Sequence, residues 1–460
     1  MKPKSFLLGL SALSVTTAAQ ADVTVDITGA TAFRAATLAS IKAKYVASGA
    51  AFKFAHDQAT SGGTTYTGAT RAIFIGTFPG VSGTTTIRCC FTGSVEGVRA
   101  LVPVTDPTPP TYYQNSLLDA TTAVVGGAEL ANQGTTGAAV NPSEIAFSDV
   151  SKASTPYSSY NLQPPSPVCG VVVFTMLTNE GSSITNVTSQ QWRALLSGGF
   201  QPLSLFTGNA ADTSYVFATG RNDGSGTRTT YMAESGYGIT SLVKQYLVVD
   251  STSTAIEALQ LVPQGGTNDS DPLTSGIQLP PGSDIKAYVD GGQTVAQSAS
   301  NASTVWGQDQ PGNGGYNSGS TLRTDMGKTG TSGVTVFDEL GEDSFGETVR
   351  ADLVTFLSLN DAVTARNNGA VICAFNGVKL NDIATSGTTM SAADKAKVTE
   401  GSYTAWGFQQ MYCRNDAYTG DTKTVYDGIK AFIPANLGAA GISKDDMHVG
   451  RSVDGGTVAP

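Results

Sequence analysis

The first part of the chain runs from a strand-like segment through a glycine into a helix-like segment, and this order constrains the fold most. Residues 23–29 alternate apolar and polar side chains and end at Gly29, and residues 32–46 place apolar side chains at near-helical spacing. A period of two is typical of a strand, and recurrence every three or four residues is typical of an amphipathic helix. Strand, turn and helix in this order predict an α/β fold.

Further segments of both kinds follow, separated by long polar stretches. Strands are predicted at 168–177, 215–218, 370–375 and 403–412, and helices at 95–104, 188–196 and 350–366. The polar stretches lie at 57–70, 107–142, 263–282 and 290–335. Because such long loops are unusual inside one compact domain, we interpret them as surface insertions on a core. The glycine-rich run 313–319 has the composition of a binding loop, but a turn-rich insertion is the favoured interpretation.

The N-terminus has the features of a secretory signal peptide. Lys2 and Lys4 precede the apolar run 6–10, which fades into small residues that end at Ala21. This pattern predicts a signal peptide over 1–21, cleavage near Ala21 and a periplasmic or extracellular protein. No later stretch approaches about 18 uninterrupted apolar residues, so no membrane insertion is expected.

The composition excludes several classes of protein. Only 14% of the 460 residues are charged, against about 25% in an average globular chain, so a charge-rich disordered chain is excluded. The 27 basic residues are outnumbered by 37 acidic ones, and the net charge is −10. A surface that binds nucleic acid is therefore not expected, and any bound anion must be held by a local group of donors.

Catalytic and metal-binding motifs are missing from the sequence. The two histidines, His56 and His448, are far apart, and there is no CxxC spacing, no GxSxG elbow and no cluster of carboxylates. We therefore expect no enzyme activity, no cofactor and no metal site. The five cysteines leave at least one thiol unpaired in a monomer, and the spacing leaves open whether one or two disulfides form.

The strongest chemical signal is the run Gly-Arg-Asn-Asp-Gly-Ser-Gly-Thr at 220–227, which follows a strand and precedes a helix-like stretch. The first turn of a helix has unpaired backbone N–H groups and a partial positive charge, so it can cradle an oxyanion. The planar guanidinium of Arg221 suits two oxygens at once, and Asp223 could orient it. Alone, the run Asp-Gly-Ser-Gly-Thr is a common turn; the preceding arginine and the strand-to-helix context favour anion binding.

Two other segments have side chains suited to the same anion. Ser94 opens the short predicted helix, where it could cap the helix, donate to an anion, or do both. Asp149 follows a strand-like segment, where it could cap a turn or face a ligand at the carboxyl edge of the sheet. A carboxylate accepts a hydrogen bond from protonated phosphate but has no donor to accept from in sulfate, so one aspartate could distinguish these anions.

These segments resemble the periplasmic phosphate-binding proteins of ABC transporters, and they occur in that family's order. The similar stretches are 27–33 (Ile-Thr-Gly-Ala-Thr-Ala-Phe), 92–98 (Thr-Gly-Ser-Val-Glu-Gly-Val), 144–151, 168–178, 188–198 and 221–227. The last stretch is the most specific. The resemblance implies a two-lobed α/β fold, each lobe a sheet flanked by helices, that closes on its ligand like a hinged clamp.

The resemblance also implies lobe boundaries, a ligand and its binding residues. Lobe I would comprise 22–165 and 398–460, and lobe II would comprise 166–397 with insertions around 263–335. The ligand would be inorganic phosphate, delivered by a monomer to an ABC transporter permease. The implied phosphate-binding residues are Thr31, Phe33 through its backbone N–H, Ser94, Asp149, Arg221, Asp223, Ser225, Gly226 and Thr227. The alternative is an exported structural or adhesive protein on the same fold, with a weakened or lost anion site.

Overall fold

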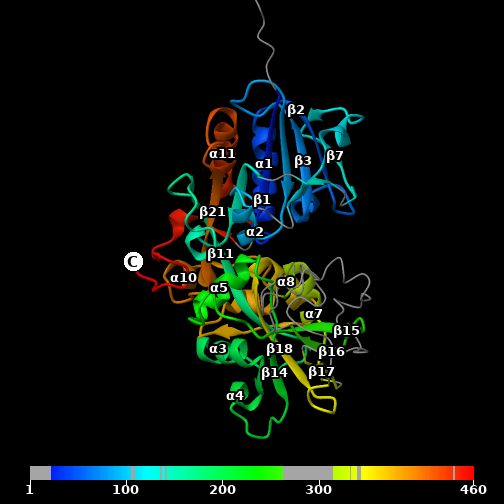
Figure 1. The fold of residues 1–460 in the computed structure, drawn as a ribbon, viewed down its shortest axis with the longest axis vertical. Helices are drawn as coiled ribbons and strands as arrows, with labels where there is room; N and C mark the ends of the chain where they lie inside the picture. The colour runs from blue at the N-terminus through cyan, green and yellow to red at the C-terminus, as the bar shows by residue number, and fades with distance from the viewer. Residues whose placement is uncertain are drawn as a thin grey trace, which may run out of the picture.

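The computed structural model describes residues 22–104, 109–134, 137–139, 142–262, 314–316, 318–331, 333–338, 343–438 and 441–460. The predicted signal peptide and most of the long insertion, 263–313, lie outside these residues. The described chain has an α/β fold with helices on both sides of a large mixed sheet, as predicted (Figure 1).

The large sheet comprises 15 strands. Its main path runs in the order β13 (Phe200–Pro202), β14 (Tyr215–Ala218), β18 (Ala351–Ser358), β11 (Val168–Thr178), β21 (Trp406–Arg414), β9 (Ile145–Ser148), β1 (Val23–Gly29), β4 (Thr85–Cys90), β3 (Arg71–Gly76), β2 (Ala51–His56) and β6 (Val124–Val125). Side branches are β7 (Ala128–Leu130), β10 (Leu162–Gln163), β19 (Val371–Ile372) and β22 (Gly441–Ile442). Smaller sheets pair β5 (Thr111–Tyr112) with β8 (Ala138–Ala139), β12 (Asn186–Val187) with β20 (Ala374–Phe375), and β15 (Tyr246–Ser251) with β16 (Ile256–Leu261) and β17 (Thr335–Phe337).

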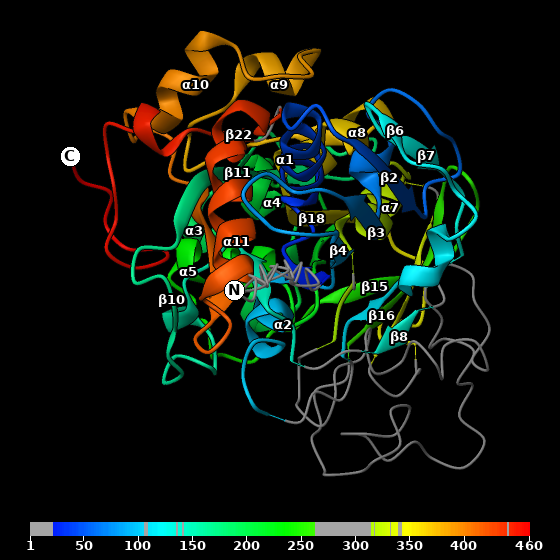
Figure 2. The same cartoon turned by 90° about the horizontal axis from the view of Figure 1, so that it is seen from above.

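The helices cover this sheet. They are α1 (Arg34–Ala47), α2 (Ser94–Arg99), α3 (Ser189–Gly198), α4 (Ser204–Thr207), α5 (Gly226–Ser235), α7 (Gly319–Met326), α8 (Leu359–Asn367), α9 (Asn381–Thr385), α10 (Ala392–Thr399) and α11 (Gly420–Phe432). Helices α1 and α11 lie side by side although they are far apart in the sequence (Figure 2). Among the described residues, no helix has the length and apolar character needed to span a bilayer.

The described residues form four hydrophobic cores, and the two largest divide the structure. The first core packs α1 and α11 against β1 to β4 through side chains such as Leu38, Tyr45 and Tyr426. The second core packs α3, α5 and α8 around β11, β14 and β18, with Trp192 and Phe356 at its centre. The first core lies in the upper half of Figure 1 and the second in the lower half.

Strands β11 and β21 connect the two cores. They pair antiparallel, with Val171 opposite Phe408. On β11, Cys169 belongs to the first core and Val171 to the second; on β21, Met411 belongs to the first core and Trp406 to the second. A two-stranded connection between separate cores is the architecture expected of a two-lobed protein.

Several predicted elements are confirmed with small changes in their ends. The predicted strands 23–29 and 215–218 are β1 and β14, and the helix predicted at 188–196 is α3. Thr188 caps α3 and forms a capping box with Gln191.

The helix predicted at 350–366 is wrong in its first half, which is strand β18. All eight residues of β18 are buried, and its polar residues Asp352, Thr355 and Ser358 recur at every third position, so the sequence has a helix-like spacing and not a period of two. The helix predicted at 95–104 ends at Arg99, and the strand predicted at 370–375 is divided into β19 and β20, which pair with different strands. The insertion predicted at 290–335 contains helix α7. No disulfide forms, because all five cysteines are buried as free thiols.

Candidate functional site

The predicted anion-binding run lies where β14 leads into α5. Ser225 is the N-cap of α5, but its hydroxyl makes no capping hydrogen bond, and Gly226 and Thr227 form the start of the helix. The side chains of Arg221, Ser225 and Thr227 are all buried. The strand, turn and helix therefore place a buried guanidinium and the first turn of a ten-residue helix in one region.

Ser94 and Asp149 meet on the side of the first core. The Ser94 hydroxyl donates to Asp149 Oδ1, and the Asp149 backbone N–H donates to Ser94 Oγ over 3.3 Å. Gly93 is the N-cap of α2 and Ser94 the first helical residue, so the predicted capping role of Ser94 is wrong. Its hydroxyl bonds to a carboxylate instead.

Burial raises the pKa of the Asp149 carboxyl from 3.8 to about 6. The hydrogen bond from Ser94 and the positive charge of Arg221 oppose this rise. Both Ser94 and Asp149 are almost inaccessible to solvent. Asp149 is therefore a buried acid whose charge depends on pH in the range where many proteins work.

Two glycines lie where the segments of Ser94 and Asp149 contact the loop before α5 and the first turn of that helix. A side chain at Gly226 would overlap Asp149 Oδ1 and would lie 2.6 Å from Ser94 Oγ. A side chain at Gly93 would lie 2.5 Å from the carbonyl oxygen of Gly224. Gly226 therefore lets the Asp149 carboxylate approach the first turn of α5, and Gly93 lets the loop before α5 approach α2.

The first backbone donors of α2 are used inside the protein. The N–H groups of Val95 and Glu96 donate to the Gly224 carbonyl oxygen over 3.1 and 3.4 Å. The Glu96 carboxylate also lies against Gly224, because a side chain there would overlap Glu96 Oε1. In this closed arrangement a carbonyl and a carboxylate of the chain occupy the N-terminus of α2.

Arg221 is the buried cation of the site. Its Nε donates to the Tyr316 carbonyl oxygen over 2.9 Å, and the carboxylates of Asp361, Asp149 and Glu96 act on its charge. Burial lowers the pKa of the Arg221 guanidinium, and these carboxylates oppose that change. Burial raises the pKa of the Asp223 carboxyl, and the positive charges of Arg228 and Arg99 oppose this rise. That Asp223 orients Arg221 stays a prediction.

Tyr316 is a contact that sequence reasoning missed. It lies in the run interpreted as an insertion, but its backbone pairs with the loop after β14: Tyr316 N–H donates to Gly220 O, and Asn222 N–H donates to Tyr316 O. Its hydroxyl donates to Asp325 Oδ2 over 2.8 Å. No local pattern indicates a contact between segments so far apart in the sequence.

Thr31 and Phe33 lie in the turn after β1, which contacts the end of β9 through a hydrogen bond from the Ala30 N–H to Phe147 O over 2.7 Å. The Phe33 N–H donates to Ala30 O over 3.3 Å in a turn, and its buried ring lies 6.0 Å from that of Phe147. The role of the Phe33 N–H as an anion donor stays a prediction. Thr31 instead lines a cavity that the sequence analysis did not identify.

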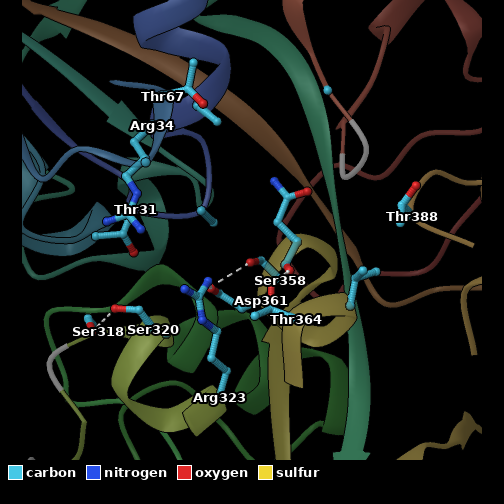
Figure 3. A pocket seen from close by; sticks show the side chains of 17 residues that line it. Thr31, Arg34, Thr67, Ser318, Ser320, Arg323, Ser358, Asp361, Thr364 and Thr388 are labelled. Atoms are coloured by element: carbon cyan, nitrogen blue, oxygen red, sulfur yellow. Dashed lines mark hydrogen bonds and ion pairs between the residues drawn. The ribbon is translucent and has the colours of Figure 1, made fainter. Parts of the chain in front are cut away.

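That cavity has a volume of about 390 Å³ and lies between α1 on one side and α7 and α8 on the other (Figure 3). Arg34 enters it from α1 and Arg323 from α7, where Arg323 Nη1 lies 2.8 Å from Asp361 Oδ1. Among the described residues, no three His, Cys, Asp or Glu side chains gather as metal ligands.

The fold and the site define a two-core α/β protein with polar and charged side chains gathered where the cores meet. No family model and no curated protein matches the chain. Among solved structures, the chain is similar to an ABC-type phosphate transport receptor from Vibrio cholerae, at 12% identity and a TM-score of 0.38, over 90% of this chain and 96% of that one. It is also similar to PstS from Borrelia burgdorferi, at 11% identity and a TM-score of 0.33, over 92% and 98%. A phosphate-binding protein from Stenotrophomonas maltophilia matches at 14% identity and a TM-score of 0.32, over 90% and 83%.

Proposed function

We propose that this protein is an exported solute-binding protein that holds inorganic phosphate between two lobes and delivers it to an ABC transporter permease. The proposed lobes are 22–165 with 398–460, and 166–397. The observation that carries the proposal is the meeting of buried Arg221, the first turn of α5 and the Ser94–Asp149 pair at one contact between the lobes.

Each of these groups has a role in holding a protonated oxyanion. The guanidinium of Arg221 supplies a positive charge, and the hydroxyls of Ser225 and Thr227 and the backbone N–H groups of α5 supply donors. Asp149 accepts the proton that phosphate carries near neutral pH. The N–H groups of Val95 and Glu96 at the start of α2 become available to phosphate only when the Gly224 carbonyl leaves them, so their use would couple binding to a small opening of the contact.

Isothermal titration calorimetry tests the proposal on the processed protein. We expect one phosphate per chain with a dissociation constant in the micromolar range or below, and a loss of about tenfold or more in Arg221→Gln, because a charge-assisted bond is removed. Arg193→Gln, on the exposed side of α3, is the matched control. Absence of heat with phosphate at micromolar protein would rule the proposal out.

Asp149→Asn tests the proton-counting role separately. Asparagine has an amide that can donate to an unprotonated oxyanion, so sulfate should compete with phosphate better in the variant than in the wild type. Unchanged phosphate-over-sulfate selectivity would remove this role from Asp149 without removing the site.

A second candidate is supported by the contacts of Gly224. Because its carbonyl and Glu96 occupy the N-terminus of α2, the fold could serve as an exported structural or adhesive protein that has lost anion binding. Glu96→Gln separates the two candidates. Phosphate affinity should rise in this variant of a binding protein, whereas a protein that has lost the site should bind phosphate in neither form.

A further inference from the structure

The cavity between α1 and the α7–α8 pair has two arginines and is separate from the contacts of Ser94 and Asp149. Its volume of about 390 Å³ falls within the range of small-molecule sites in proteins. The elements of both cores contribute to the lining. Thr31, Arg34 and Thr67 come from the segment that forms the first core, and Ser320 and Arg323 come from α7. A molecule bound there would touch both cores.

The charges in the cavity favour an anion. Arg34 and Arg323 point into it from opposite sides (Figure 3). Burial lowers the pKa of the Arg34 guanidinium, and the positive charge of Arg323 adds a smaller decrease that Asp361 opposes. Asp361 is the single carboxylate in the lining and lies 2.8 Å from Arg323. The Arg34 side chain makes no hydrogen bond or ion pair with another of the described residues, and the carboxylates of Asp361 and Asp57 act on its charge from further away. The side chains that line the cavity therefore carry two positive charges and one negative charge.

The uncharged lining favours a ligand with hydroxyl groups. Seven hydroxyl side chains line the cavity: Thr31, Thr67, Ser318, Ser320, Ser358, Thr364 and Thr388. The apolar part of the lining consists of the small residues Ala32, Ala35 and Val363. Hydroxyls can both donate and accept, so they match the groups of a polyol better than an apolar or aromatic ligand.

The cavity adjoins the proposed phosphate site. The Asp361 carboxylate acts electrostatically on both Arg34 and Arg221. The Gly93 N–H donates to Gly29 O over 3.0 Å, which places the turn before Thr31 next to the start of α2. Ligands in the two places would therefore stabilise the same closed arrangement of the lobes.

We propose that this cavity is a second ligand site, for a small polyhydroxy organic anion whose acidic group lies between Arg34 and Arg323. The acidic group supplies the charge that the two guanidiniums lack, and the hydroxyl groups of the ligand exchange hydrogen bonds with the serine and threonine lining. A sugar acid and a sugar phosphate share this chemistry. The proposal goes beyond phosphate binding and does not depend on it.

Calorimetry with four probes tests this site on the processed protein. D-Gluconate and D-glucose 6-phosphate provide an acidic group with hydroxyls; D-glucose lacks the acid, and acetate lacks the hydroxyls. At least one of the first two should bind about tenfold or more tightly than both glucose and acetate, because a charge-assisted bond is added to the polyol contacts. The stronger of the two identifies the acidic group as carboxylate or phosphoryl.

Substitutions in the lining test whether the organic anion binds in the cavity. Arg34→Gln should weaken the organic anion about tenfold or more, while Arg193→Gln leaves it unchanged. Ala35→Leu, which adds volume to the lining without changing charge, should also weaken it and serves as a second variant if Arg34→Gln folds poorly. Arg221→Gln should affect inorganic phosphate more than the organic anion, which separates the two sites. Binding of neither organic anion above the level of glucose, or binding unchanged in both cavity variants, would overturn the proposal.

Discussion

Replacing Asp149 by asparagine is expected to stabilise the ligand-free protein at neutral pH. The carboxyl is buried between Ser94 and the first turn of α5, and burial raises its pKa from 3.8 to about 6 despite the nearby charge of Arg221. Asparagine keeps an oxygen that can accept the Ser94 hydroxyl bond but has no charge to desolvate. The substitution therefore removes an ionisable group and conserves the shape of the side chain.

The size and sign of the effect follow from the two pKa values. A rise from 3.8 to about 6 corresponds to about 3 kcal/mol at 1.36 kcal/mol for each pKa unit. Because the folded state holds this proton more tightly, its contribution to stability is complete below about pH 4 and is lost as pH rises to about 6. The variant should therefore gain up to about 3 kcal/mol over the wild type at pH 7.5 and little near pH 4.

Urea denaturation of both proteins between pH 4 and pH 8 measures this difference. The two free energies of unfolding should converge at the acidic end and separate across pH 4 to 6. Asp119→Asn, on an exposed turn, controls for the change in net charge. A variant less stable than the wild type at pH 7.5, or a difference that does not change with pH, would refute the reasoning about burial.

Three further results are expected. The Gly226→Ala variant should be less stable than the wild type by about 1–3 kcal/mol in urea denaturation and should lose most of its phosphate affinity, because the new methyl overlaps Asp149. The control Gly450→Ala places a methyl in open space, so its stability should change by less than about 0.5 kcal/mol. Burial raises the pKa of Glu234 from 4.5 to about 7 although Arg451 pairs with it; stability should therefore fall as pH rises from about 4.5 to 7, and Glu234→Gln should flatten that part of a urea titration. Finally, Ellman's reagent should find no reactive thiol in the native protein at pH 8 and five after denaturation, since all five cysteines are buried and free.

The segment that carries Arg221 could be predicted because its signals are local. The apolar run of β14, the arginine and the two glycines that permit the turn and the start of α5 all fall within about twenty residues. The approach of Asp149 to the same region follows a general rule of α/β sheets. β9 pairs parallel with β1, so its carboxyl end lies at the edge where ligands bind.

Other parts could not be predicted because their signals depend on distant residues. Strand β18 is buried along its whole length, and its polar residues, three positions apart, give it the spacing of a helix. Arg34 and Arg323 meet only because the two cores are brought together, and neither lies in a recognisable motif. Tyr316 contacts Arg221 through its backbone carbonyl, which no side-chain pattern encodes.

The charged side chains where the two cores meet show how an acidic protein can hold an anion. Three guanidinium groups and four carboxyl groups act on one another there: Arg34, Arg221, Arg323, Asp57, Glu96, Asp149 and Asp361. Fully ionised, this set has a net charge of −1, so a phosphate dianion would bring further negative charge into a buried site. A proton on the ligand or on Asp149, whose carboxyl has a pKa of about 6, reduces that charge. The carboxylates therefore do not oppose anion binding as such; they require that the bound anion be accompanied by a proton.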